Sequence, residues 1–222
     1  MADWDAMLER EAGRYADGEA RLPEAADGDQ RQRQLTRLGN AAYGAGLCAL
    51  MLGDEGAARD WLGRAAARWR ESFESAPPGS WGRPIGAVKA QLLAGDAEGA
   101  EDAARWTLET GAAEAESPIG RYAACLALLV LGRDEEARVH ADAIRVHPDF
   151  PAPVGDALAM IAAGTDAVGY VEAIEAVLES FETRDEYLED VPVADTVIVL
   201  RKLAEPRGLA AELSSSLLPE RK

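Results

Sequence analysis

The residues best suited to metal chemistry are two histidines, but their surroundings do not complete a site. His140 and His147 are seven residues apart, which places them on one face of a helix. Asp142 and Asp149 are close in sequence. A metal site needs further ligands at a defined geometry, and no spacing in the chain places them. We therefore interpret both histidines as solvated helix residues and predict no metal site and no cofactor.

Motifs for nucleophilic or nucleotide chemistry are missing from the sequence. No serine or cysteine stands beside a plausible base, and there is no phosphate-binding glycine loop or dinucleotide fingerprint. Cys48 and Cys125 both fall on the apolar face of an expected helix and are interpreted as buried thiols in a reducing compartment. We predict a protein that is not an enzyme and has no catalytic residues.

The composition is strongly acidic. Among 222 residues, 40 are acidic and 23 are basic, which gives a net charge of −17 at pH 7. Such a charge argues against binding the phosphate backbone of nucleic acids, which requires clustered Lys and Arg. Only three of the basic residues are lysines. This pattern fits a halophilic source, although a GC-rich genome would also favour Ala, Gly and Arg.

Targeting and membrane segments are not predicted. The N-terminal sequence MADWDAMLER has no basic region followed by an apolar run, so no secretory signal is visible. The longest apolar stretch, residues 122–131, is too short to span a bilayer. A chain that is 48% hydrophobic can bury one sizeable core. We expect one cytoplasmic domain that does not insert into a membrane.

Four helix pairs recur along the chain, each with a glycine at its turn. The turn glycines are Gly53, Gly95, Gly132 and Gly164. Ten residues before them, on one face of each first helix, stand Tyr43, Ile85, Tyr122 and Val154. Five residues after them stand the small residues Ala58, Ala100, Ala137 and Gly169. Small residues let the second helix lie close against the first, and glycine suits a left-handed helix end.

This pattern resembles the tetratricopeptide repeat. Ala58, Ala100 and Ala137 match the small residue of the family's second helix, and Pro148 matches its closing proline. The usual large aromatics of the first helix are mostly missing, and the spacing between turn glycines is not constant. The alternative is an ordinary helical bundle whose hairpins look alike by chance.

The resemblance implies an all-α, right-handed superhelix of antiparallel helix hairpins within one domain, residues 1–222. Residues 40–181 would form the four repeats, with N-terminal capping helices in residues 1–39 and a C-terminal cap in residues 182–222.

Other segments carry signals for where helices begin and end. We expect at least eight helices, and a non-helical insertion at residues 76–83 because Pro77, Pro78 and Gly79 interrupt the helical pattern. Ser117 and Pro118 mark a helix start. The remaining expectations are an N-terminal helix over 3–16, a break over 18–28, helices over 29–52 and 54–73, a helix starting at Pro192, and a short helix followed by an apolar strap over 209–220.

Six residues are candidate contacts with a protein partner. They are Trp81, Arg121, Tyr122, Glu186, Tyr187 and Asp190. Trp, Tyr and Arg most often carry interface energy, and acidic rims speed association with basic partners. The alternative interpretation is that Trp81 is a plug between hairpins, that Tyr122 belongs to the core, and that the acidic segment 181–190 is a solvated connector.

The C-terminal third is similar to the immunity protein 49 family of polymorphic-toxin systems. The matching features over residues 150–220 are a helix to Phe181, an acidic connector, a helix after Pro192, Arg207-Gly208-Leu209, and then Leu217-Leu218-Pro219. The resemblance implies a non-catalytic protein that neutralises a cognate toxin by direct binding. The acidic segment 181–190 would suit a basic toxin domain. The alternative is a tetratricopeptide-like adaptor or scaffold that binds peptides or partner proteins.

Overall fold

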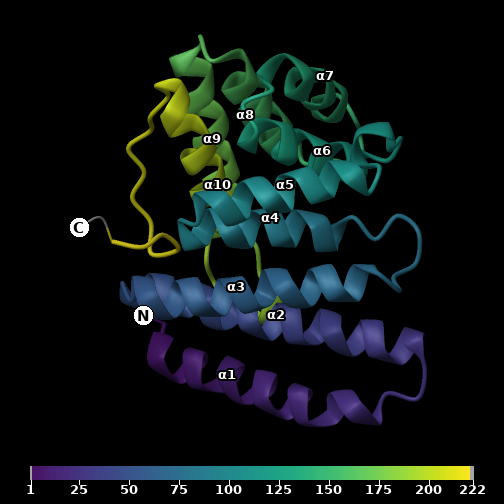
Figure 1. Ribbon diagram of the computed structural model, residues 1–222. Coiled ribbons are helices and arrows are strands. Elements are labelled where there is room, and N and C mark those ends of the chain that lie inside the picture. The colour runs from purple at the N-terminus through teal and green to yellow at the C-terminus, as the bar shows by residue number, and fades with distance from the viewer. Residues whose placement is uncertain (1, 221–222) are drawn as a thin grey trace.

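The computed structural model describes residues 2–220, and all regular structure within them is helical. Each helix packs against its neighbour in sequence, which confirms the predicted all-α helix-hairpin array. The α-helices are α1 Trp4–Arg21, α2 Gly28–Leu52, α3 Glu55–Phe73, α4 Gly82–Ala94, α5 Ala97–Glu109, α6 Pro118–Val130, α7 Asp134–Arg145, α8 Ala152–Ala163, α9 Ala167–Glu182 and α10 Asp195–Ala204. In Figure 1, α1 to α5 run side by side, whereas α8 and α9 stand across that direction.

The hairpin turns use the glycines predicted from the sequence. Gly53, Gly95, Gly132 and Gly164 all have φ between 66° and 73°, a region that penalises a β-carbon. After three of them an aspartate caps the next helix, and Asp54, for example, accepts a 3.0 Å hydrogen bond from the amide of Ala57. A left-handed glycine followed by an N-capping aspartate therefore reverses the chain within a few residues.

Small residues allow the paired helices to approach closely. Ala58, Ala100 and Ala137 are buried, as their repeat position predicts. A β-carbon on Gly46 of α2 would lie 2.6 Å from Cγ of Leu62 on α3. On Gly155 of α8 it would lie 2.6 Å from Cα of Arg145 on α7. Glycine at these two positions is required by contact between helices and not by a turn.

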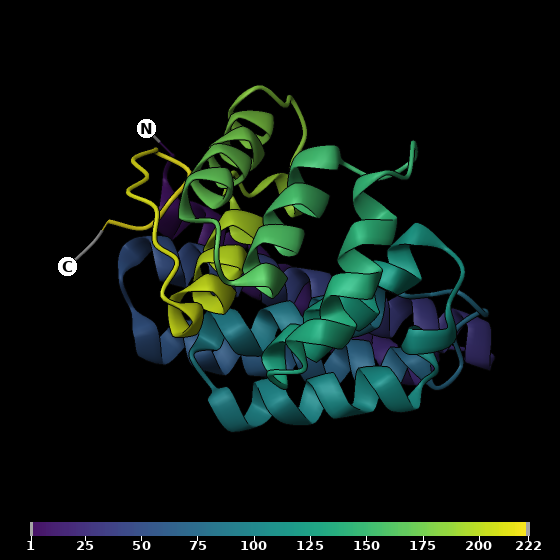
Figure 2. The same ribbon diagram turned by 90° about the horizontal axis from the view of Figure 1, so that it is seen from above.

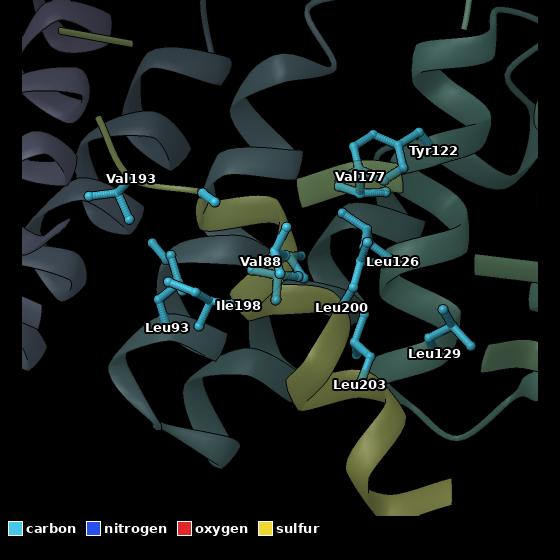
Figure 3. Close-up of a cluster of buried hydrophobic side chains, with 14 of the residues drawn as sticks. Val88, Leu93, Tyr122, Leu126, Leu129, Val177, Val193, Ile198, Leu200 and Leu203 are labelled. Atoms are coloured by element: carbon cyan, nitrogen blue, oxygen red, sulfur yellow. The ribbon is translucent and has the colours of Figure 1, made fainter. Parts of the chain in front are cut away.

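Helix α10 fills the inner side of the array. It packs against α4, α8 and α9, and Figure 2 shows it among these helices. In Figure 3, Ile198 lies beside Leu93 of α4, and Leu200 and Leu203 lie toward Leu126 and Leu129 of α6. The C-terminal segment therefore covers the array along its inner face.

The N-terminal helix is longer than predicted. Helix α1 continues through Gly18 to Arg21, and a 3-10 turn at Leu22–Glu24 contains Pro23. Gly18 does not break the helix. A β-carbon there would lie 2.7 Å from Cδ2 of Leu38, so this glycine lets α1 pack closely on α2.

The C-terminal tail was also predicted incorrectly in part. Helix α10 begins at Asp195 and not directly after Pro192, and residues 209–215 form an extended strap with no short helix. Leu209 and Ala211 are buried while Ala210 and Glu212 are exposed. An alternation with a period of two residues is the pattern of extended chain, and three consecutive serines further along the tail disfavour a helix.

Candidate functional site

The connector from α9 to α10, residues 183–194, is fixed by contacts to α1 and α2. The backbone oxygen of Glu189 accepts a 2.6 Å hydrogen bond from Arg10. Its carboxylate pairs with Arg14 and accepts a 3.1 Å hydrogen bond from the Nδ2 of Asn40. Glu189 and Asp190 both have φ of 55°, which is unfavourable for residues other than glycine. The three contacts hold this strained turn in place.

A buried carboxylate positions the two arginines. The side chain of Glu11 is fully buried, with Arg10 Nε at 2.8 Å and Arg14 Nη1 at 3.1 Å. Gly44 of α2 leaves the space for it, because a β-carbon there would lie 3.1 Å from Cγ of Glu11. Glu11 therefore orients the cations that hold Glu189.

The outer edge of the connector is acidic and exposed. Asp185, Glu186 and Asp190 are all exposed, and among them the side chain of Leu188 is 50% exposed. Tyr187 is half-buried, and its hydroxyl donates a 2.5 Å hydrogen bond to the backbone oxygen of Phe181. We name Asp185, Glu186, Leu188 and Asp190 the connector rim.

A groove of about 370 Å³ lies where the connector meets α2 and α4. Trp81 and Leu188 both line it. Its wall includes Trp69, whose indole is enclosed by two glycines, because a β-carbon on either Gly39 or Gly86 would lie 2.6 Å from the ring.

A three-residue charge network lies at one side of this groove. The Asp195 carboxylate accepts a 2.6 Å hydrogen bond from the Tyr43 hydroxyl, and Lys89 Nζ lies 2.6 Å from the same oxygen. Burial alone would raise the pKa of Asp195, but the charge and hydrogen bond of Lys89, together with Tyr43, bring that pKa below its ordinary value. Burial also raises the pKa of Tyr43. The network therefore contains an ionised Asp195 paired with Lys89.

Arg83, at the start of α4, is the second cation of the groove. Its Nε donates to Ser72 at 2.8 Å and to Thr36 at 3.2 Å, and its Nη2 donates to Gln32. All three acceptors are uncharged, and within residues 2–220 Arg83 forms no ion pair. Burial lowers the pKa of Arg83. The groove thus contains one guanidinium whose charge is not neutralised by a carboxylate.

The structure brings together only part of the predicted contact set. Trp81 and the connector meet at the groove, whereas Arg121 and Tyr122 lie on α6. Tyr122 is 8% exposed, and its ring packs 5.4 Å from that of Phe150, so it belongs to the core. Arg121 Nε donates a 3.3 Å hydrogen bond to the backbone oxygen of Glu116.

Trp81 is half-buried and fills the gap between hairpins. Its ring lies 6.3 Å from that of Phe73, and its indole nitrogen would lie 2.9 Å from a β-carbon on Gly120. One part of this side chain is therefore structural while another lines the groove.

Sequence reasoning missed six polar residues of the groove: Thr36, Asn40, Ser80, Arg83, Lys89 and Asp195. Lys89 carried a signal, because it is the one charged residue in the run IGAVKAQLL and a buried lysine requires a partner. Its partner Asp195 is far along the chain and could not be inferred from spacing.

The described residues hold neither a metal-binding cluster nor a membrane-spanning helix. Among residues 2–220, no cluster of three His, Cys, Asp or Glu side chains has a metal-binding arrangement. Cys48 and Cys125 are buried, as predicted, and burial raises the pKa of Cys48 to about 11. No helix in these residues combines the length and the apolar character needed to cross a membrane.

Comparisons with protein-family models, with curated proteins and with solved structures each give no match to this chain. The resemblances to the tetratricopeptide repeat and to immunity protein 49 therefore rest on sequence features alone.

Proposed function

We propose that this protein acts by stoichiometric, non-catalytic binding to another protein, as an immunity protein that neutralises a cognate toxin. The observation that carries the proposal is the connector rim, an exposed acidic surface in a fixed conformation. The likeness of residues 150–220 to the immunity protein 49 family supports the choice of a toxin as the partner.

The rim suits a basic partner. Leu188 offers an apolar contact that is 50% exposed, and the carboxylates of Asp185, Glu186 and Asp190 surround it in sequence. An apolar centre with a charged edge is the usual composition of a protein interface, and acidic side chains accelerate the approach of a basic surface. Because Glu189 is held by Arg10, Arg14 and Asn40, little ordering entropy is lost when the rim binds.

The second candidate, a peptide-binding adaptor, would use the inner face of the array. In this chain α10 lies there, with Asp195 bound to Tyr43 and Lys89. A peptide could bind that face only after α10 had left it. This arrangement favours an outer surface for partner binding.

On this proposal the cognate toxin is encoded by a neighbouring gene, and the test uses the purified full chain and that toxin domain. We expect one-to-one capture in a pull-down, and survival of cells that co-express both proteins. Exchanging Glu186 and Asp190 for Lys should slow association and flatten its salt dependence, because the attraction to a basic partner is lost. Leu188→Ala should mainly accelerate dissociation.

The matched control exchanges Glu172 and Glu175 for Lys. Both are exposed residues on α9 outside the connector, so the change in net charge is the same. If both double variants slow association equally, the rim is not the contact surface. If the parent protein neither binds nor rescues, the immunity proposal is wrong and the adaptor becomes the better candidate.

A further inference from the structure

We propose that the groove between α2, α4 and the connector binds a small organic carboxylate with an aromatic body. This inference does not rest on toxin binding, because the cation that carries it, Arg83, lies outside the connector rim, while Leu188 belongs to both the rim and the groove wall. The chemistry of its ligand follows from three features of the wall: an unneutralised guanidinium, a set of aromatic rings, and a limited volume.

Arg83 supplies the charge that a carboxylate requires. Its Nε is held by Ser72, which is fully buried, and by Thr36. Its Nη2 is held by Gln32, which is 3% exposed. Within residues 2–220 its Nη1 makes no hydrogen bond, so donors remain for a ligand while the side chain is already ordered. Arginine binds carboxylates through paired N–H donors, and preorganisation of this kind increases affinity.

The other charges of the groove do not cancel this cation. Lys89 and Asp195 neutralise each other at 2.6 Å, with side chains that are 13% and 14% exposed. Arg83 therefore leaves the groove with one net positive charge, in a protein whose net charge is −17. An anion is attracted to this groove and repelled by most of the remaining surface.

The apolar part of the wall selects an aromatic body. Trp81, Ile85 and Leu188 line the groove with half-buried or exposed side chains, whereas Trp69 and Tyr43, which also line it, are only 5% and 2% exposed. A flat ring packs well against an indole such as that of Trp81. Its volume of about 370 Å³ lies at the low end of the range of roughly 300–1,000 Å³ for small-molecule pockets. One ring with a short acidic side chain fits this space.

The experiment titrates the full chain with phenylacetate by isothermal calorimetry, with phenylacetamide as the neutral isostere and inorganic phosphate as an anion without a ring. We expect saturable one-to-one binding of phenylacetate. Phenylacetamide and phosphate should each bind at least about tenfold more weakly, because the amide lacks the negative charge and phosphate lacks the aromatic ring.

Arg83→Gln should weaken phenylacetate binding by roughly tenfold or more, while Arg121→Gln, a half-buried arginine outside the groove, should leave it unchanged. Leu188→Glu keeps every hydrogen bond of Arg83 and adds a negative charge at the groove, so it should also weaken binding. Circular dichroism shows which variants fold. If Arg83→Gln does not fold, the affinity of Leu188→Glu for phenylacetate tests the proposal. No saturation with phenylacetate, equal affinity for the amide or phosphate, or unchanged affinity in the folded groove variants would overturn the proposal.

Discussion

The hydroxyl of Tyr43 on α2 donates a 2.6 Å hydrogen bond to the carboxylate of Asp195 on α10. Lys89 on α4 reaches the same oxygen. Asp195 is the first residue of α10, where a negative charge is also favoured by the helix dipole. One carboxylate therefore joins three helices and adds a polar contact to the apolar packing that holds α10 inside the array.

Replacing Asp195 with Asn should lower the free energy of unfolding at pH 7 by roughly 3–5 kcal/mol, because Lys89 then lacks its counter-charge in a site that is largely removed from water. Urea denaturation of parent and variant measures this difference. Asp185→Asn on the exposed connector is the control, and its effect should stay within about 0.5 kcal/mol.

The difference in unfolding free energy between the parent and Asp195→Asn should depend on pH. The folded-state pKa of Asp195 lies below the ordinary value of 3.8. A depressed pKa contributes stability that is fully present above the ordinary value and is lost as the pH falls through the folded-state pKa. The difference between parent and Asp195→Asn should therefore shrink as the pH falls below 3.8. A difference that is constant or grows toward acid would contradict the ionised pair.

Two glycines in helices should respond oppositely to alanine. A β-carbon on Gly86 of α4 would lie 2.6 Å from the Trp69 ring, whereas one on Gly63 of α3 would meet no atom within 4 Å. Gly86→Ala should destabilise the protein by about 1–3 kcal/mol through overpacking. Gly63→Ala should stabilise it by roughly 0.5–1 kcal/mol, because alanine favours the helix. Thermal melts that shift in the same direction for both variants would show that Trp69 is not confined as described.

Salt should stabilise the protein if its acidity is a halophilic adaptation. A net charge of −17 destabilises the compact state through self-repulsion, and salt shortens the Debye length to about 3 Å at 1 M. The melting temperature should therefore rise as potassium chloride increases from low to molar concentration. A melting temperature that does not change with potassium chloride would leave the base composition of the genome as the explanation for the acidic residues.

The sequence predicted the hairpins because their determinants are local. Gly53 and Asp54, for example, specify a helix end and the next helix start from adjacent positions. The function of Gly18 could not be predicted in this way, because its reason is the contact with Leu38 of another helix. Glycine marks both a turn and a close helix contact, and only the partner residue distinguishes the two.

The groove was less predictable than the hairpins. The residue types of Trp81 and of the acidic connector predict contact sites, and the structure places both beside the groove. The roles of Asp195 and Arg83 could not be predicted, because an isolated aspartate or arginine in a chain with 40 acidic and 23 basic residues carries no signal. Their importance arises from contacts with distant helices.

The connector should open when its anchor is removed. Glu189 has φ of 55°, which costs about 1–2 kcal/mol in a residue other than glycine, and its side chain binds Arg14 and Asn40. Glu189→Ala removes both side-chain contacts and leaves that cost in place. Cleavage after Arg184, an exposed residue of the connector, by an arginine-specific protease should become several-fold faster, as followed by mass spectrometry. Glu186→Ala is the matched control, because it removes an exposed carboxylate from the same segment, and its cleavage should match the parent. Equal rates in the two variants, at equal melting temperatures, would mean that Glu189 does not hold the connector.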